Sequence, residues 1–273
     1  MQMLNYILYR FKRWRKTPRV FLALILITVF ITTPSLFLAR LAVKQASRIT
    51  PWLFPFIMCD RFVLMCVMLA VILVFSDVPI CDDTLNYILM RIGRRSWILG
   101  EILYVFLTSL MLMSYIWIYS LFINFSNLSF DTEWGAILLS FASPTIDRGV
   151  GIAQLTNIYT DPAAACALCL FLSITACTLL GLIVLYLSLK YSRVVGITTG
   201  SCFAILDFMI YYVLGDYPAA FFLSPVSWVD ISCLIGEMYP TVTYAELATL
   251  LIIITLVLLC VHNVKGRDEL TIS

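Results

Sequence analysis

Four ionisable residues lie inside long apolar segments of this 273-residue chain, namely Asp60, Arg61, Glu101 and Asp207. A charge near the centre of a membrane costs ~3 kcal/mol or more, so such a side chain faces protein or water rather than lipid. Asp207 stands near the middle of its segment and is the candidate for lining a substrate path. The alternative is that it forms a structural pair with a neighbouring helix or is neutral.

The other three residues have structural interpretations. Asp60 and Arg61 are adjacent and point to different sides of a helix, and we expect both to reach the outer membrane interface. Glu101 lies one to two turns from the inner end of its segment. We expect it to meet an arginine of the preceding loop and to act as a hinge.

Motifs for catalysis and nucleotide binding are missing. The sequence contains no GxxxxGK[ST], HExxH or GxSxG motif. Its single histidine, His262, nearly excludes histidine-based metal and triad chemistry. Cys166 and Cys169 form a CxxC, which indicates helix packing because no histidine or second CxxC accompanies it. We therefore expect no enzyme activity, no cofactor and no nucleic-acid partner for this chain.

The elements that hold these residues are membrane helices. The chain is 62% hydrophobic and 12% charged, whereas a soluble domain carries about 25% charged residues. Helices are expected because backbone groups inside a membrane must be paired internally. Six windows approach the ~20 residues that cross a bilayer: Val20–Ala39, Leu53–Phe75, Ile98–Ile123, Ala163–Leu189, Val195–Leu214 and Leu247–Val264.

The distribution of lysine and arginine predicts the orientation. Thirteen of the 18 basic residues lie in segments that are cytoplasmic if the N-terminus is inside, and four lie outside. We expect a single transmembrane domain over 1–273, with an amphipathic helix in 1–19, a six-span bundle in 20–264 and a cytoplasmic tail in 265–273. Both termini are then cytoplasmic, in a plasma membrane.

Two segments beside the spans have distinctive patterns. Residues 3–16 place apolar side chains on one face, from Leu4 to Trp14, opposite Lys12, Arg13 and Lys16. This pattern is typical of an elbow helix in the cytoplasmic interface. The second segment, Gly215–Glu246, is half apolar and is broken by prolines. We expect it to form re-entrant helices that enter the outer leaflet and return, packed on protein.

A short charged stretch between the second and third spans predicts another amphipathic helix. Leu85, Ile88, Leu89 and Ile92 share one helical face. Asp82 or Asp83 is suited to cap its start, where a carboxylate is stabilised by free N–H groups. Gly93 follows the last apolar position, as at a helix end, and Arg91, Arg94 and Arg95 surround that end.

The residues Asp82–Leu89, followed by Arg94–Glu101, are similar to the inner segment of the ABC-two permeases, the membrane subunits of type V ABC exporters. Here Glu101 replaces the usual lysine, and Asp83 stands where glycine is common. The stretch Leu223–Trp228 also resembles the Ser-Pro–aromatic element before the last span of that family. The order of elements resembles the family over nearly the whole chain.

The resemblance implies that Asp82–Ile92 is a coupling helix that fits a groove in a separate ATPase, which would bind ATP and Mg²⁺. The expected contact residues are Asp82, Asp83, Leu85, Asn86, Ile88, Leu89, Ile92, Arg94 and Arg95. A second permease, identical or related, is expected to complete the substrate path. The implied function is export of a hydrophobic or amphipathic peptide, antibiotic or lipid from a bacterial cell.

Another class of function stays open. A stand-alone membrane immunity or sensor protein would bind a toxic peptide through the acidic outer loops and would need no ATPase. An adjacent ATPase gene favours transport, and its absence favours the stand-alone protein. An intramembrane enzyme is a third interpretation, and the sequence lacks the catalytic pairs that it needs.

Overall fold

The structure is a computed structural model, which describes residues 2–80, 85–141, 155–156, 158–215, 217–234 and 238–265. Within these ranges the chain forms helices and no β-strand. Five helices are long and apolar enough to cross a membrane: α2 (Pro18–Gln45), α6 (Arg94–Ile123), α9 (Pro162–Lys190), α10 (Arg193–Val213) and α11 (Val242–Lys265). The chain is therefore an all-α, membrane-embedded protein, as its composition predicts.

The predicted second span is divided. Leu53–Phe75 contains α3 (Phe54–Met58) and α4 (Arg61–Phe75), and the 15 residues of α4 are fewer than the ~20 that cross a bilayer. The break lies at Asp60, which has extended backbone geometry. Its carboxylate accepts the backbone N–H groups of Phe62 at 3.0 Å and Val63 at 3.2 Å, and so caps α4. A side chain that caps one helix interrupts the continuous helix that hydropathy predicts.

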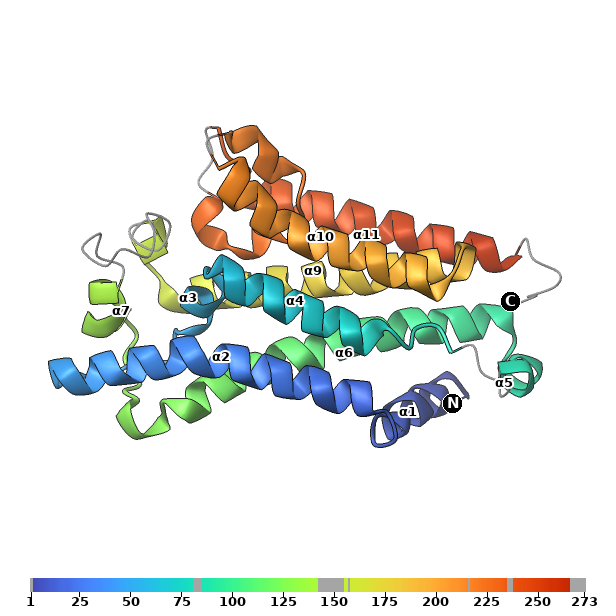
Figure 1. The fold of residues 1–273 in the computed structure, drawn as a ribbon, viewed down its shortest axis with the longest axis horizontal. Coiled ribbons are helices and arrows are strands. Elements are labelled where there is room, and N and C mark those ends of the chain that lie inside the picture. The colour runs from blue at the N-terminus through green and yellow to red at the C-terminus, as the bar shows by residue number, and fades with distance from the viewer. Residues whose placement is uncertain are drawn as a thin grey trace.

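Short helices gather at the two ends of the bundle (Figure 1). At one end, α1 (Gln2–Trp14) and α5 (Leu85–Ile92) lie at the same end of the bundle as the last turn of α11. We call this the α5 end. At the opposite end, which we call the α7 end, lies α7 (Gly135–Phe141). The remaining short elements are the 3₁₀ helices η1 (Phe125–Asn127), η2 (Pro218–Phe222), η3 (Ser227–Val229) and η4 (Ile231–Cys233).

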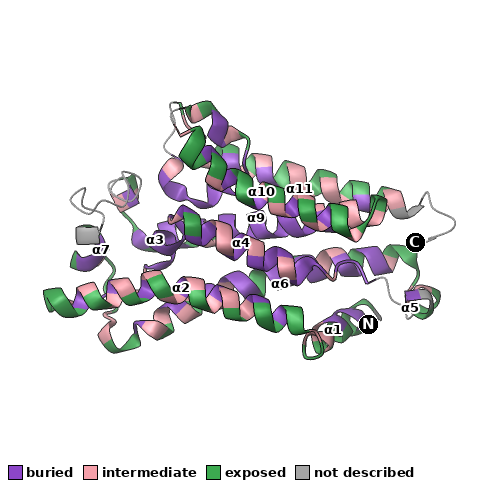
Figure 2. Ribbon diagram, viewed as in Figure 1, coloured by how far each residue is buried: buried purple, intermediate pink, exposed green. Residues whose placement is uncertain are grey.

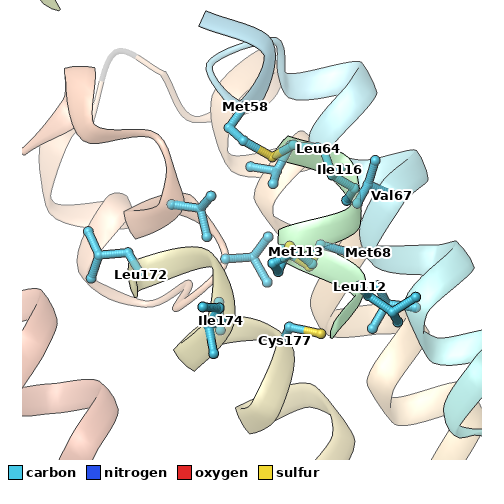
Figure 3. Close-up of a cluster of buried hydrophobic side chains, with 14 of the residues drawn as sticks. Met58, Leu64, Val67, Met68, Leu112, Met113, Ile116, Leu172, Ile174 and Cys177 are labelled. Atoms are coloured by element: carbon cyan, nitrogen blue, oxygen red, sulfur yellow. The ribbon is translucent and has the colours of Figure 1, made fainter. Parts of the chain in front are cut away.

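Helix α9 lies at the centre of the bundle (Figure 2). In its most apolar window 72% of the residues are buried, against 17% in α11. Apolar side chains of α4, α6 and α9 meet in one cluster, where Met68, Met113 and Cys177 are fully buried (Figure 3). Gly181 permits this approach, because a Cβ atom there would lie 2.5 Å from Val105 Cγ1. Membrane helices associate through such close packing, since lipid removes most of the hydrophobic driving force.

Residues 217–234, which we call the cover, pack on the spans as the interrupted apolar pattern predicts. The cover contacts α9 and α10. Its Val226 and Val229 are buried, and Trp228 Nε1 donates to the carbonyl of Phe221 at 2.8 Å. Tight 3₁₀ turns pair the backbone where prolines prevent a longer helix. Its position in a leaflet stays a prediction.

Candidate functional site

A buried ion pair lies at the α5 end. Glu101 of α6 is fully buried, and its Oε2 lies 3.1 Å from Arg10 Nη2 of α1. The Tyr6 hydroxyl donates to Glu101 Oε1, and the backbone N–H of Ile80 donates to the same oxygen at 3.4 Å. We call Tyr6, Arg10 and Glu101 the Glu101 cluster. The expected partner of Glu101 was wrong, because the arginine comes from α1 and not from the preceding loop.

The same cluster fixes α1 against the bundle. The Arg10 guanidinium lies 4.1 Å from the centre of the Tyr104 ring, and Trp14 Nε1 donates to the Tyr104 hydroxyl at 2.7 Å. The amphipathic pattern predicts an interfacial helix, and it gives no sign that polar side chains of α1 pack on the protein. Leu4 and Leu8 are 62% and 51% exposed, whereas the polar side chains of the Glu101 cluster point inward. Arg10 can be buried because its counter-ion Glu101 is buried with it.

Protonation states in α1 follow from this geometry. Burial, and then the Glu101 carboxylate, raises the pKa of Tyr6 above its usual range. Burial opposes the positive charge of Arg10, but Glu101 together with Tyr104, Tyr6 and Asp77 outweighs that effect and raises the pKa of Arg10. Tyr6 is therefore neutral and Arg10 is charged at neutral pH.

Helix α5 packs its apolar face against the rest of the protein, and its opposite face is exposed. Leu85 is buried, and Ile88, Leu89 and Ile92 are partly buried against the core. By contrast, Tyr87 is 77% exposed and Met90 is 87% exposed. The face that we expected to meet a partner is thus largely used within the chain. The predicted contacts Asp82 and Asp83 and the side chain of Asn86 lie outside the described residues.

Gly93 is the single residue between α5 and α6, as its predicted role as a helix end requires. Its φ of 83° is in the region that favours glycine. Its N–H donates to the carbonyl of Leu89 at 2.9 Å, and its carbonyl accepts from Trp97 N at 3.0 Å. Arg94 and Arg95 are exposed at the start of α6. A displacement of α5 would therefore pass directly to α6.

A groove of about 440 Å³ separates α1 from α5. Three tyrosines and Arg91 contribute to its walls, and Arg91 forms no ion pair with the described residues. The full lining is Asn5, Tyr6, Tyr9, Tyr87, Ile88, Arg91 and Ile92. The α5 end therefore presents aromatic rings and a positive charge beside the exposed face of α5.

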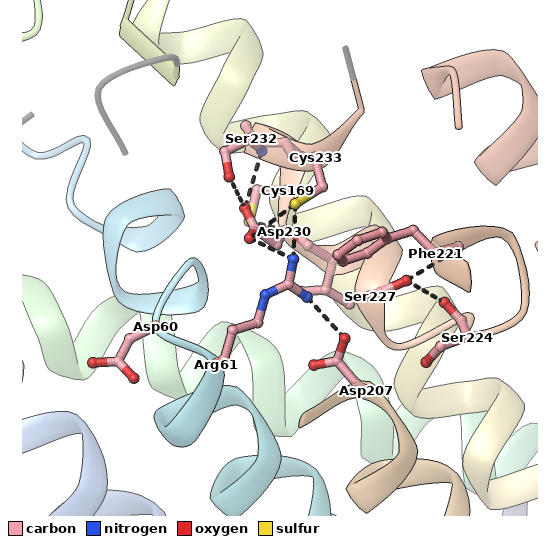
Figure 4. A network of polar contacts seen from close by, with 12 residues as sticks. Asp60, Arg61, Cys169, Asp207, Phe221, Ser224, Ser227, Asp230, Ser232 and Cys233 are labelled. Carbon is pink, nitrogen blue, oxygen red and sulfur yellow. Dashed lines mark hydrogen bonds and ion pairs between the residues drawn. The ribbon is translucent and has the colours of Figure 1, made fainter. Parts of the chain in front are cut away.

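A second buried ion-pair network lies toward the α7 end (Figure 4). Arg61, the first residue of α4, places Nη1 2.8 Å from Asp207 Oδ1 of α10 and Nη2 2.8 Å from Asp230 Oδ2 of the cover. We call these three residues the Arg61 cluster. Each side chain is at most 4% exposed. The guanidinium also lies 5.1 Å from the Tyr211 ring centre, so an aromatic face covers it.

Asp230 receives more hydrogen bonds than Asp207. Its Oδ1 accepts from Ser232 N at 3.0 Å and Ser232 Oγ at 2.5 Å. Its Oδ2 meets Arg61 and also lies 3.7 Å from Cys233 Sγ. Ser232 and Cys233 of the cover and Arg61 of α4 thus donate to both oxygens of Asp230.

The Arg61 cluster corrects the expected position of Arg61 and gives Asp207 a structural partner. Arg61 does not reach the interface, because two carboxylates hold it inside, whereas Asp60 caps α4 and points away from the cluster (Figure 4). Asp207 forms the structural pair that was the alternative to a substrate path. Sequence reasoning missed Asp230; the signal was that an arginine inside an apolar segment needs a carboxylate elsewhere.

Compared with family models, curated proteins and solved structures, the chain gave no match. Among the residues that the structure describes, no group of three or more His, Cys, Asp or Glu side chains is arranged to hold a metal ion. The arrangement offers two buried charge clusters, a partly exposed helix joined to α6 through one residue, and a basic aromatic groove.

Proposed function

We propose that the chain is the permease subunit of an ATP-driven exporter, with six spans and both termini in the cytoplasm. A separate ATPase would dock at the α5 end, and a second permease would complete the path for a hydrophobic or amphipathic substrate. The observation that carries the proposal is the placement of α5, which has an exposed face and is joined to α6 through Gly93 alone.

The contacts at this end support force transmission. A partner that pushes on α5 would act on α6 through Gly93. The Glu101 cluster ties α1, α6 and the segment before α5 together, through Arg10 and the N–H of Ile80. ATP hydrolysis outside the membrane needs such a contact, because work must pass into the spans through groups that move together.

The structure changes which residues should contact the ATPase. Leu85 is buried and unsuited to an interface, whereas Tyr87, Met90 and Arg91 are exposed on one side of α5. Aromatic residues, methionine and arginine are also enriched at protein interfaces. We therefore propose that these three residues, with Arg94 and Arg95, form the docking surface.

The test is purification of the tagged full-length chain from its own host in mild detergent. We expect a soluble ATPase at near-stoichiometric amounts, and its loss in the Tyr87→Asp/Met90→Asp variant. The matched control is Tyr217→Asp/Met238→Asp, which changes an exposed tyrosine and methionine at the other end of the bundle. If the wild-type protein is folded and monodisperse yet carries no ATPase, the proposal is wrong and the stand-alone immunity or sensor protein is favoured.

A further inference from the structure

The Arg61 cluster carries an unbalanced charge. One guanidinium faces two carboxylates, so the three side chains sum to one negative charge when both aspartates are ionised. All three are almost completely buried. A buried charge without a counter-charge is too costly to persist, and a bound cation or proton restores the balance.

The structure distinguishes the two aspartates. Asp230 receives donors at both oxygens, from Ser232, Arg61 and Cys233. Asp207 receives Arg61 at Oδ1 only, and its Oδ2 is buried without a partner among the described residues. An unpaired buried carboxylate oxygen is rare in folded proteins and calls for an explanation. The missing positive charge therefore belongs at Asp207 Oδ2.

We propose that the Arg61 cluster is a binding site for one monovalent cation at Asp207 Oδ2, and that this cation is a proton. An alkali-metal ion shares the same charge but needs several oxygen ligands. Among the described residues no group of three or more His, Cys, Asp or Glu side chains could hold a metal ion, and a proton needs only one oxygen. This inference does not depend on the proposed transport function.

Among the residues that the structure describes, no other group in contact with the cluster supplies the charge. Its surroundings are Cys59 beyond α3, Cys169 of α9, Tyr211 of α10 and Cys233 of η4. None of these side chains is a cation in either protonation state. Arg61 is therefore the only positive side chain in the described part of this network.

Occupancy of the site controls how the cover is held. With the proton bound, Arg61 joins α4, α10 and the cover through a hydrogen bond to Asp207 Oδ1 and an ion pair with Asp230. When the cation leaves, the two aspartates repel each other and one negative charge stays buried. The link between α10 and the cover is then weakened, so the cover would loosen on cation release.

Infrared spectroscopy of the purified full-length chain in lipid nanodiscs tests the proposal. At about pH 8 exposed carboxyl groups are ionised, so a carbonyl stretch from a protonated carboxyl group must come from a buried one. We expect such a band in the wild type, shifted in D₂O, and its loss in Asp207→Asn. Asp161→Asn, which changes an exposed helix-capping aspartate, is the control and should keep the band.

Asp230→Asn checks the charge balance itself. Removal of one carboxylate leaves Arg61 and Asp207 as a neutral pair, so Asp207 gives up its proton and the band disappears even though Asp207 is intact. A band that persists in this variant would contradict the charge-balance argument.

Thermal stability in NaCl, KCl and choline chloride distinguishes the two cations. A proton gives the infrared band and no dependence on the salt. An alkali ion gives no band, and stability in NaCl or KCl that is lost in Asp207→Asn. The wild-type measurements suffice where a variant does not fold: no band together with no salt dependence overturns the proposal.

Discussion

The Glu101 cluster and the Arg61 cluster each bury a charged arginine, but they neutralise its charge differently. Each buries an arginine guanidinium beside an aromatic ring and joins a span to an element outside it. The Glu101 cluster matches one arginine to one glutamate and is neutral. The Arg61 cluster pairs one arginine with two aspartates, so its ionised side chains carry one net negative charge. The difference indicates that the first is a fixed attachment, whereas the second depends on a further positive charge.

The largest effect is expected when the shared arginine is removed. Arg61→Gln leaves two buried carboxylates together, and we expect a loss of ~3–5 kcal/mol, enough to prevent folding of a marginal protein. Thermal unfolding in detergent and the yield of monodisperse protein measure it. Arg48→Gln, at an exposed position, is the control and should change neither. An unchanged Arg61→Gln protein would show that the carboxylates do not depend on the guanidinium.

Double variants should show that stability responds differently to charge removal at the two clusters. Glu101→Gln leaves Arg10 buried without its counter-ion and should cost ~3 kcal/mol. Adding Arg10→Met removes the remaining charge, so at least half of that loss should be recovered. At the other cluster, Arg61→Met with Asp207→Asn still leaves Asp230 charged and should recover nothing. The same thermal measurement compares both pairs, and equal recovery at the two clusters would contradict the charge count.

The smallest effect concerns Tyr6. Tyr6→Phe removes a hydrogen bond to a charged group and should cost ~1.5–2 kcal/mol at neutral pH. Above its ordinary pKa of 10.0, Tyr6 loses its proton in the unfolded chain but keeps it in the fold, where its pKa is raised. The unfolded state then binds fewer protons, and the stability contributed by Tyr6 falls as the pH rises.

Unfolding of the wild type and Tyr6→Phe between about pH 7 and 11 checks this prediction, because only the wild type should carry that slope. Tyr9→Phe changes a more exposed tyrosine of the same helix and serves as the control. A slope that is the same in wild type and Tyr6→Phe would assign the high-pH loss to other groups.

The local sequence pattern was sufficient to predict most of the helices. Apolar runs predicted five of the long helices, although α11 begins at Val242 rather than Leu247. Periodicity predicted α5, and Gly93 ends it where the pattern stops. These features are encoded by neighbouring residues, so a reader of the sequence can find them. The predicted second span is not one continuous helix, because the capping side chain of Asp60 divides it.

The partners of the buried charges were decided by tertiary structure alone. Arg61 and Asp207 are 146 positions apart, and Tyr6 and Glu101 are 95 apart. Periodicity shows that α5 has an apolar face, but not whether that face meets its own chain or another one. The sequence by itself determined an all-α membrane protein with costly charges in its spans. Only the packing of distant helices determined which charge neutralises which, and that a single negative charge is left over.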